Sequence, residues 1–128
     1  MRHKYNKLKK LNTWVQKQEN VIRNLLTSLV STWQLVTTPK RAKVLKSRAD
    51  NFFSRLVRIT KDYPDANDAR REVIRYIKSV IYTDEWWKKV LNDLLPANLK
   101  AENASFVSNY KLWVRPWDNS EKILVKLI

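Results

Sequence analysis

The sequence contains no glycine and no cysteine. P-loops, dinucleotide-binding fingerprints and nucleophile elbows are all built on glycine, so the sequence as written excludes the enzyme classes that depend on these motifs. The lack of cysteine excludes a disulfide framework, a zinc site made of thiolates and a cysteine nucleophile. A chain without cysteine suits a reducing cytosol, and we expect a cytoplasmic protein.

Candidates for catalysis are also few. The only histidine, His3, lies in a charged segment where no neighbouring side chain would orient it as a general base. Asp84 and Glu85 are adjacent, so on a helix they would point in different directions and could not act as a catalytic acid and base. We therefore predict that the protein is not an enzyme and that it uses no cofactor, no metal and no small-molecule substrate.

A long apolar run is missing too. No segment approaches the roughly 18 apolar residues of a membrane span. The N-terminal segment MRHKYNKLKKLN is basic, but it lacks the apolar core and the small-residue cleavage site of a secretory signal. We therefore expect no membrane partner. With 128 residues, of which 44% are hydrophobic, the chain has the length of one domain that can bury a core without disulfides or metals.

Acidic residues are scarce in the first part of the chain. Residues 1–49 hold one acid, Glu19, and account for +11 of the formal net charge of +14. A one-sided excess creates a face that attracts phosphates, whereas an evenly spread excess mainly affects solubility. A nucleic acid is therefore the leading candidate for the partner, and a solvated basic tail on an unrelated domain is the alternative. The basic residues of this part are Arg2, Lys4, Lys7, Lys9, Lys10, Lys17, Arg23, Lys40, Arg41, Lys43, Lys46 and Arg48.

The first element of the fold is preceded by a basic arm. Residues 1–12 are too charged and too poor in apolar residues to fold alone, and we expect them to precede a single α/β domain over residues 13–128. Thr13 with Gln16 fits a capping box, which predicts that a helix begins there. Apolar residues at the helical period predict its buried stripe. These residues are Val21, Ile22, Leu25, Leu26, Leu29 and Val30.

A short strand and a second helix follow. Residues 34–38 (QLVTT) favour a strand, and Thr38 followed by Pro39 is typical of a helix N-cap and first helical position. Basic residues crowd the first turns of this helix, where they oppose the helix dipole unless an anion lies nearby. This conflict favours a phosphate partner over a purely structural role. The basic residues concerned are Lys40, Arg41, Lys43, Lys46 and Arg48.

The rest of the chain predicts two more helices, a loop and a hairpin. Asp65 can cap a third helix, and the start signal at Thr83 predicts a fourth helix that Pro96 terminates. The pattern then weakens into a loop over residues 100–109, after which two runs of alternating apolar residues predict half-buried strands. Their inward positions are predicted to be Tyr110, Leu112 and Val114, and then Ile123, Val125 and Leu127.

These elements predict the fold class. We expect an α+β fold, with about four helices packed on a small three-stranded sheet, mixed or antiparallel, and with a basic N-terminal arm. The QLVTT strand would supply the third strand beside the predicted hairpin.

Five segments together carry a resemblance to a known family. They are MRH at 1–3, KLKKLN at 7–12, IRNLLTSL at 22–29, VTTPKRAK at 36–43 and LWVRPWDNSEKILVKLI at 112–128. With these segments in this order, the chain resembles the L-seventeen family of the bacterial large ribosomal subunit. The similarity spans nearly the whole chain and is weakest from about 60 to 109.

The resemblance implies a structural role without catalysis. It implies a mixed α/β domain anchored on large-subunit ribosomal RNA near the outer rim of the peptide exit tunnel, in the cytoplasm, beside neighbouring large-subunit ribosomal proteins. Carried over position by position, the RNA-facing residues would be Arg2, His3, Lys4, Lys7, Lys9, Lys10, Arg23, Asn24, Thr37, Thr38, Lys40 and Lys43.

Tryptophan stands where members of that family usually carry glycine, at Trp33, Trp113 and Trp117. Average usage would give about nine glycines in this length, and glycine suits turns because it tolerates positive φ, whereas tryptophan there is strained. One hypothesis is that the source organism reads UGA as glycine while this sequence was written with UGA as tryptophan. The other is that the tryptophans are genuine and pack on RNA or protein. The residues in question are Trp14, Trp33, Trp86, Trp87, Trp113 and Trp117.

Two other interpretations of the residues stay open. The chain could be a small basic DNA-binding or nucleoid-type protein, in which case its second helix would dock in the major groove of duplex DNA. It could also be an RNA-cleaving enzyme, which would need a general base that His3 is poorly placed to provide.

Overall fold

The computed structural model of the protein describes Leu11, residues 15–100 and residues 105–127. Apart from Leu11, the predicted arm lies outside these residues, as does Thr13. No helix within the described ranges is long and apolar enough to cross a membrane. The elements are α1 (Val15–Thr32), β1 (Gln34–Thr37), α2 (Pro39–Asp62), α3 (Ala66–Val80), α4 (Asp84–Lys89), the π-helix η2 (Val90–Leu94), α5 (Leu95–Lys100), β2 (Val107–Val114) and β3 (Glu121–Leu127).

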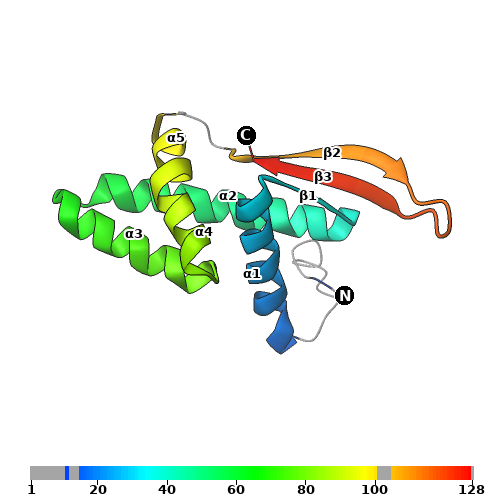
Figure 1. Cartoon of the computed structure of the whole chain (residues 1–128), viewed down its shortest axis with the longest axis horizontal. Helices are drawn as coiled ribbons and strands as arrows, with labels where there is room; N and C mark the ends of the chain where they lie inside the picture. Colours follow the sequence, from blue (N-terminus) through cyan, green and yellow to red (C-terminus); the bar gives the residue numbers. More distant parts are fainter. Residues whose placement is uncertain (1–10, 12–14, 101–104, 128) are drawn as a thin grey trace, which may run out of the picture.

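The structure confirms the predicted α+β fold (Figure 1). Since α4, η2 and α5 follow one another without a break, they form one helical segment, the fourth in the described chain. The predicted apolar stripe of α1 faces the core, because helical periodicity places its members on one side. Four of its residues are buried and two are partly buried: Ile22, Leu26, Leu29 and Val30, then Val21 and Leu25.

Helix α2 is the longest helix and contacts α1, α3, α5, β2 and β3. It begins where the sequence predicts. Thr38 has the extended backbone of an N-cap (φ −76°, ψ 159°), and Pro39 occupies the first helical position, which its fixed φ suits. The buried residues of α2 form the centre of the core: Ala42, Val44, Leu45, Ala49, Phe52, Phe53 and Leu56.

The third and fourth helical segments also begin as predicted. The side chain of Asp65 accepts a hydrogen bond from the backbone N–H of Asn67 at 3.0 Å, which caps α3. The prediction that Pro96 ends the fourth segment is wrong, because Pro96 lies in the first turn of α5. In the π-helix before it, the N–H of Leu95 donates to the carbonyl of Val90. This wider turn accommodates the proline, whose ring would clash with the preceding turn of a regular α-helix.

The sheet is antiparallel, with the strand order β1-β3-β2. Directly paired residues point to the same side of a sheet, so the register decides which side chains face α2. Ile123 pairs with Thr37 on one side and Lys111 on the other, and Val125 pairs with Asn109. The prediction that Ile123, Val125 and Leu127 face inward is confirmed, since all three are buried.

Two predictions about β2 are wrong. The strand begins at Val107, inside the segment expected to be a loop. Its predicted inward residues Tyr110, Leu112 and Val114 are 53%, 38% and 48% exposed. The residues of β2 on the side of α2 are Val107, Asn109 and Lys111. Beyond them, the ribbon of β2 and β3 extends past the start of α2, where no helix covers it (Figure 1).

Positive φ occurs at two non-glycine residues in the described chain, Trp33 (φ 67°) and Asn119 (φ 53°). Trp33 directly follows α1 and donates its N–H to the carbonyl of Leu29 at 2.9 Å, a helix end that usually carries glycine. Trp113 falls within a register irregularity of β2, but its φ is not positive, so the prediction of strain there is wrong. The prediction of strain at Trp117 is wrong, because Asn119, a residue type that tolerates this conformation, takes the left-handed position in the hairpin turn.

Candidate nucleic-acid interface

The start of α2 is basic and carries no acid in its first turn. Arg41 and Lys43 are exposed, and Lys40 is half-buried. Among the residues that the structure describes, neither Arg41 nor Lys43 takes part in an ion pair. Cations at this helix end oppose the dipole. The local conflict expected from the sequence is therefore present in the folded chain.

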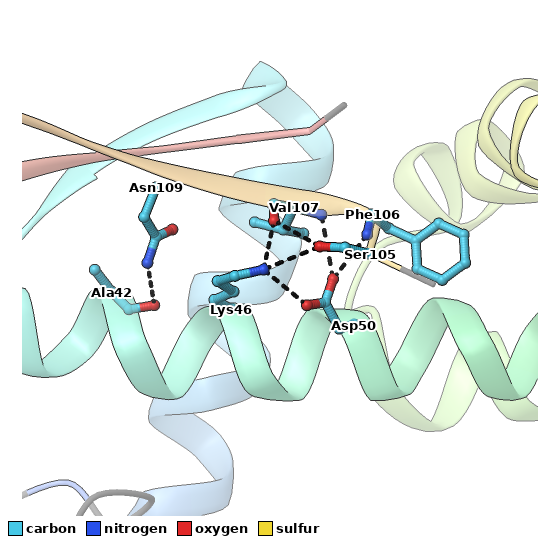
Figure 2. A network of polar contacts seen from close by, with 7 residues as sticks. All are labelled: Ala42, Lys46, Asp50, Ser105, Phe106, Val107 and Asn109. Carbon is cyan, nitrogen blue, oxygen red and sulfur yellow. Dashed lines mark hydrogen bonds and ion pairs between the residues drawn. The ribbon is translucent and has the colours of Figure 1, made fainter. Parts of the chain in front are cut away.

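One residue of the basic run has a structural role instead. The Nζ of Lys46 donates to Asp50 Oδ2 (3.0 Å), Ser105 Oγ (3.0 Å) and the carbonyl of Val107 (2.7 Å) (Figure 2). Asp50 Oδ1 in turn accepts from the backbone N–H groups of Phe106 (2.9 Å) and Val107 (3.2 Å). This network ties α2 to the beginning of β2, so Lys46, which the sequence analysis counted in the basic run, contributes to the fold.

Arg48 is only loosely engaged. Its Nη2 lies 2.9 Å from Glu19 Oε1 of α1, and the two side chains are 45% and 65% exposed. Such an exposed pair contributes little, on the order of 0–1 kcal/mol. The pair therefore reduces the local charge without fixing Arg48, which remains within reach of another anion.

A fourth cation joins the start of α2 through the fold. Lys111 of β2 and Lys43 of α2 line a hollow of about 350 Å³ between the helix and the sheet, together with Asn109 and Glu121. Asn109 Nδ2 donates to the carbonyl of Ala42 at 3.3 Å and holds β2 beside the helix (Figure 2). Lys40, Arg41, Lys43 and Lys111 are called the helix-start patch below.

Sequence reasoning missed Lys111 because alternation in β2 placed it opposite the apolar residues, on the side expected to face solvent. Only its pairing with Ile123 shows that it faces α2. The sequence did contain information that places Lys111 beside α2, namely the alternation of β3, from which Ile123 was correctly expected to face inward. It could be used only once the register between the two strands was known.

Two predicted RNA-facing residues lie elsewhere. Arg23 is half-buried, donates from Nε to the carbonyl of Val80 at 3.2 Å, and has its guanidinium carbon 4.1 Å from the ring centroid of Tyr82. The neighbouring Asn24 is exposed. Arg23 thus faces α3, whereas the start of α2 lies on the other side of α1 (Figure 1). The fold does not bring these two predicted groups together.

The remaining predicted residues divide into two sets. Thr37 is buried, with 8% of its surface exposed, and Thr38 is half-buried at the N-cap without a side-chain capping bond. Thr37 therefore presents little side-chain surface to a partner. The arm residues lie outside the described residues, and their contacts stay predictions: Arg2, His3, Lys4, Lys7, Lys9 and Lys10.

No group of three or more potential metal ligands occurs in the described ranges. The basic residues gather on surfaces, and the hollow between α2 and the sheet carries two lysines, Lys43 and Lys111, against one acid, Glu121. This arrangement suits the binding of an extended polyanion through phosphate contacts.

Comparison with known proteins gives a consistent result. The family model described as ribosomal protein L17 matches residues 21–128. The large ribosomal subunit protein bL17 of Mycoplasmopsis pulmonis is 30% identical over 120 residues, covering 91% of each chain. The proteins of the same name from Clostridium perfringens and Clostridium acetobutylicum are 27% identical over 120 residues, covering 94% of this chain and 96% of theirs. The chain therefore belongs to the ribosomal protein L17 family.

Proposed function

We propose that the protein is a structural constituent of the large ribosomal subunit that binds large-subunit ribosomal RNA. It does so through its basic arm and the helix-start patch, near the rim of the peptide exit tunnel and in contact with neighbouring large-subunit proteins. Family membership supports the ribosomal role. The single observation that supports RNA binding by this surface is the set of exposed cations at the acid-free start of α2.

The free energy of the helix explains why this observation matters. Each cation in the first turn of a helix costs about 0.3–1 kcal/mol, because the dipole favours anions there. Lys111 adds a like charge on the opposite wall of the same hollow as Lys43. An RNA phosphate near this helix end interacts favourably with the dipole and with the cations on both walls. The unfavourable arrangement in the free chain becomes favourable in the complex.

The same chemistry predicts how RNA is recognised. Lysine and arginine contacts to phosphates release counterions, so the affinity falls as the salt concentration rises. The deep major groove of an A-form helix hides base edges, so recognition is mainly of RNA shape and backbone. Ordering of the arm on RNA costs entropy, which its phosphate contacts offset. The proposed function involves no catalysis.

Binding of the purified chain to a large-subunit ribosomal RNA transcript tests the proposal. The variant Arg41→Ala/Lys43→Ala removes two cations from the helix-start patch. The control Arg58→Ala/Lys61→Ala removes two exposed cations from the far part of the same helix. We expect the patch variant to bind about tenfold more weakly near physiological salt. Its logarithmic salt slope should decrease by about two, one for each lost phosphate contact. The control should keep the wild-type slope.

Three results would argue against the proposal. Equal losses in both variants mean that only net charge matters. An unchanged salt slope in the patch variant means that these cations do not contact phosphate. Wild-type binding to duplex DNA as tight as to ribosomal RNA supports the DNA-binding alternative instead.

A further inference from the structure

A second basic surface lies at the junction of α1, α2 and α3, away from the helix-start patch. A groove of about 170 Å³ opens there, which we call the three-helix groove. Its floor contains the buried side chains Ile22, Leu26 and Phe52. Its wall and rim are polar. The groove therefore combines an apolar base with hydrogen-bonding groups, as sites for planar heteroaromatic rings do.

Arginines flank this groove from two sides. Arg23 is held by the carbonyl of Val80 and by the ring of Tyr82, so its guanidinium has a fixed position at one wall. Arg48 lines the opposite part of the groove and reaches Glu19 at 2.9 Å. Two guanidinium groups against the one carboxylate of Glu19 leave a net positive charge at this groove, which favours an anionic ligand.

An aromatic side chain completes the wall. Tyr76 of α3 lines the groove, and the guanidinium carbon of Arg55 lies 4.7 Å from its ring centroid. Desolvation by burial raises the pKa of Tyr76 above its usual 10.0, and the nearby arginines oppose that rise. The phenol is therefore neutral at physiological pH and its O–H can donate a hydrogen bond.

We propose that the three-helix groove binds one unpaired ribonucleotide of the RNA, with the base against the apolar floor and the flanking phosphates held by Arg23 and Arg48, the two arginines that line the groove. This inference rests on the proposed function and adds a site to it. Single-stranded RNA is typically recognised through bases that leave the stack and lie against aromatic or guanidinium planes. The floor, the arginines and the aromatic wall supply these contacts in one place.

The polar rim predicts which bases fit. Glu19 and Asn51 lie at the groove, and a carboxylate accepts hydrogen bonds but cannot donate them. Bases with an exocyclic amine on the Watson–Crick edge, namely adenine, cytosine and guanine, give Glu19 an amine donor, whereas uracil offers only N3–H between two carbonyl oxygens that repel a carboxylate. The groove therefore favours an amine-bearing base. Because one oxygen of Glu19 binds Arg48, the other oxygen is positioned for the base.

A variant that fills the groove tests this site. Asn51 is exposed on α2, so Asn51→Phe occupies the groove without changing the charge. The control Asn67→Phe adds the same ring at an exposed position of α3. In base-specific chemical probing of the RNA complex, we expect wild type and control to protect an unpaired base that the Asn51→Phe variant leaves reactive. The affinity of the filled variant should fall about tenfold, because one base stack is lost.

A change at the rim that keeps the size of the side chain but replaces its carboxylate by an amide gives a second test that does not depend on filling the groove. Replacing the protected base by uracil should weaken wild-type binding. In Glu19→Gln that penalty should shrink, since the amide can donate to a uracil carbonyl. If the Asn51→Phe variant is folded and protects the same bases as wild type, the groove inference is overturned while the proposed function stands. If wild type binds no ribosomal RNA, both fail.

A separate observation, the backbone at Trp33, carries a second inference. We infer that the source organism inserts glycine at position 33, and at every other tryptophan written from the same codon, by reading UGA as glycine. Trp33 ends α1 in the left-handed region at φ 67°, where glycine has no steric cost and tryptophan does. Trp33 is 44% exposed, and the complete absence of glycine from the sequence follows from the same cause.

The intact mass of the chain isolated from the organism's own ribosomes tests this inference. Each replaced tryptophan lowers the mass by the difference between tryptophan and glycine, and we expect at least one such step. A mass that matches six tryptophans overturns the inference. A recombinant comparison is independent of the organism. Trp33→Gly and Trp33→Ala both lose the ring, which lies 4.8 Å from Lys89 Nζ, but only glycine relieves the backbone. The glycine variant should melt about 3 °C higher than the alanine variant, and equal melting contradicts the strain at Trp33.

Discussion

The basic run at the start of α2 has two parts, residues 40–43 and residues 46–48, which are alike in sequence but differ in what they contact. Arg41 and Lys43 are exposed and form no ion pair within the described chain. Lys46, one turn further along, is bound to Asp50 and to the beginning of β2. Lysine is therefore exposed and outside any ion pair of the described chain in one turn, and holds the fold together in the next.

The crossing of β2 over the helix explains the difference. Opposite Lys46, the strand begins and offers a carbonyl and a hydroxyl, while Asp50 supplies the countercharge. Opposite Lys43, the strand offers Lys111, another cation, across the same hollow. Lys46 is surrounded by acceptors and is satisfied internally, whereas Lys43 and Lys111 share their hollow with one carboxylate, that of Glu121, which leaves a net positive charge for an external anion. The predictions below test this contrast.

The largest expected effect is on stability. Asp50→Ala removes the acceptor of two backbone N–H groups and the countercharge of Lys46. We expect the free energy of unfolding to fall by about 2–3 kcal/mol, less than for a fully buried pair because Lys46 is partly exposed. Urea denaturation measures this loss. The exposed Asp93→Ala control should stay within about 0.5 kcal/mol of wild type. If the two variants are equally stable, the network does not join α2 to β2.

The next largest effect is expected from a charge reversal at Lys43, in the exposed part of the basic run. Lys43→Glu places an acid directly after the first turn of α2, opposite Lys111. We expect the free chain to gain about 0.3–0.5 kcal/mol, because an anion near this helix end interacts favourably with the dipole and with Lys111, and RNA affinity to fall. A rise in stability together with a fall in RNA affinity would be characteristic of a residue whose role is to bind a partner. Losses in both quantities would contradict that role for Lys43.

A smaller effect is expected where the basic run ends. Arg48 pairs with Glu19 in an exposed position, so Arg48→Ala should change the unfolding free energy by less than about 0.5 kcal/mol. Lys46→Ala, its structural neighbour in the run, should cost about 1–2 kcal/mol. Thermal denaturation of the two single variants compares them directly. A larger loss for Arg48→Ala than for Lys46→Ala would reverse the assignment of structural and external roles.

The smallest effect is confined to high pH. Burial raises the pKa of Tyr76 in the folded chain above the 10.0 of the exposed group. The folded state thus holds the phenol proton more tightly, so this contribution to stability is complete below pH 10.0 and is lost as the pH rises through the folded pKa. Wild type should lose stability relative to Tyr76→Phe over that interval. A difference between the two that stays constant with pH would contradict the burial of this hydroxyl.

Much of the fold followed from local patterns. The apolar stripe of α1, the Thr38-Pro39 start of α2, the Asp65 cap of α3 and the inward residues of β3 were predicted correctly, because each depends on neighbours a few residues away. The features that the sequence did not predict depend on contacts between residues far apart in the chain. The role of Lys46 depends on β2, more than fifty residues later, and no periodicity reveals that pairing.

Two further misses have physical causes of the same kind. The alternation of β2 identified two faces but not which one α2 covers, and the register with β3 decided that Lys111 faces inward. Pro96 is normally a helix breaker, and only the π-helical turn before it lets the helical segment continue. Sequence alone therefore predicted the elements, while the partition of cations between fold and partner required the tertiary structure.

The most direct test of this partition is co-sedimentation of the tagged chain with the large ribosomal subunit through a salt wash, in the organism's own cells or in reconstituted subunits. We predict that wild type and Arg58→Ala/Lys61→Ala remain with the subunit, whereas Arg41→Ala/Lys43→Ala is released at lower salt. Release of all three proteins at the same salt concentration, or recovery of wild type only in free or DNA-bound fractions, would contradict the account.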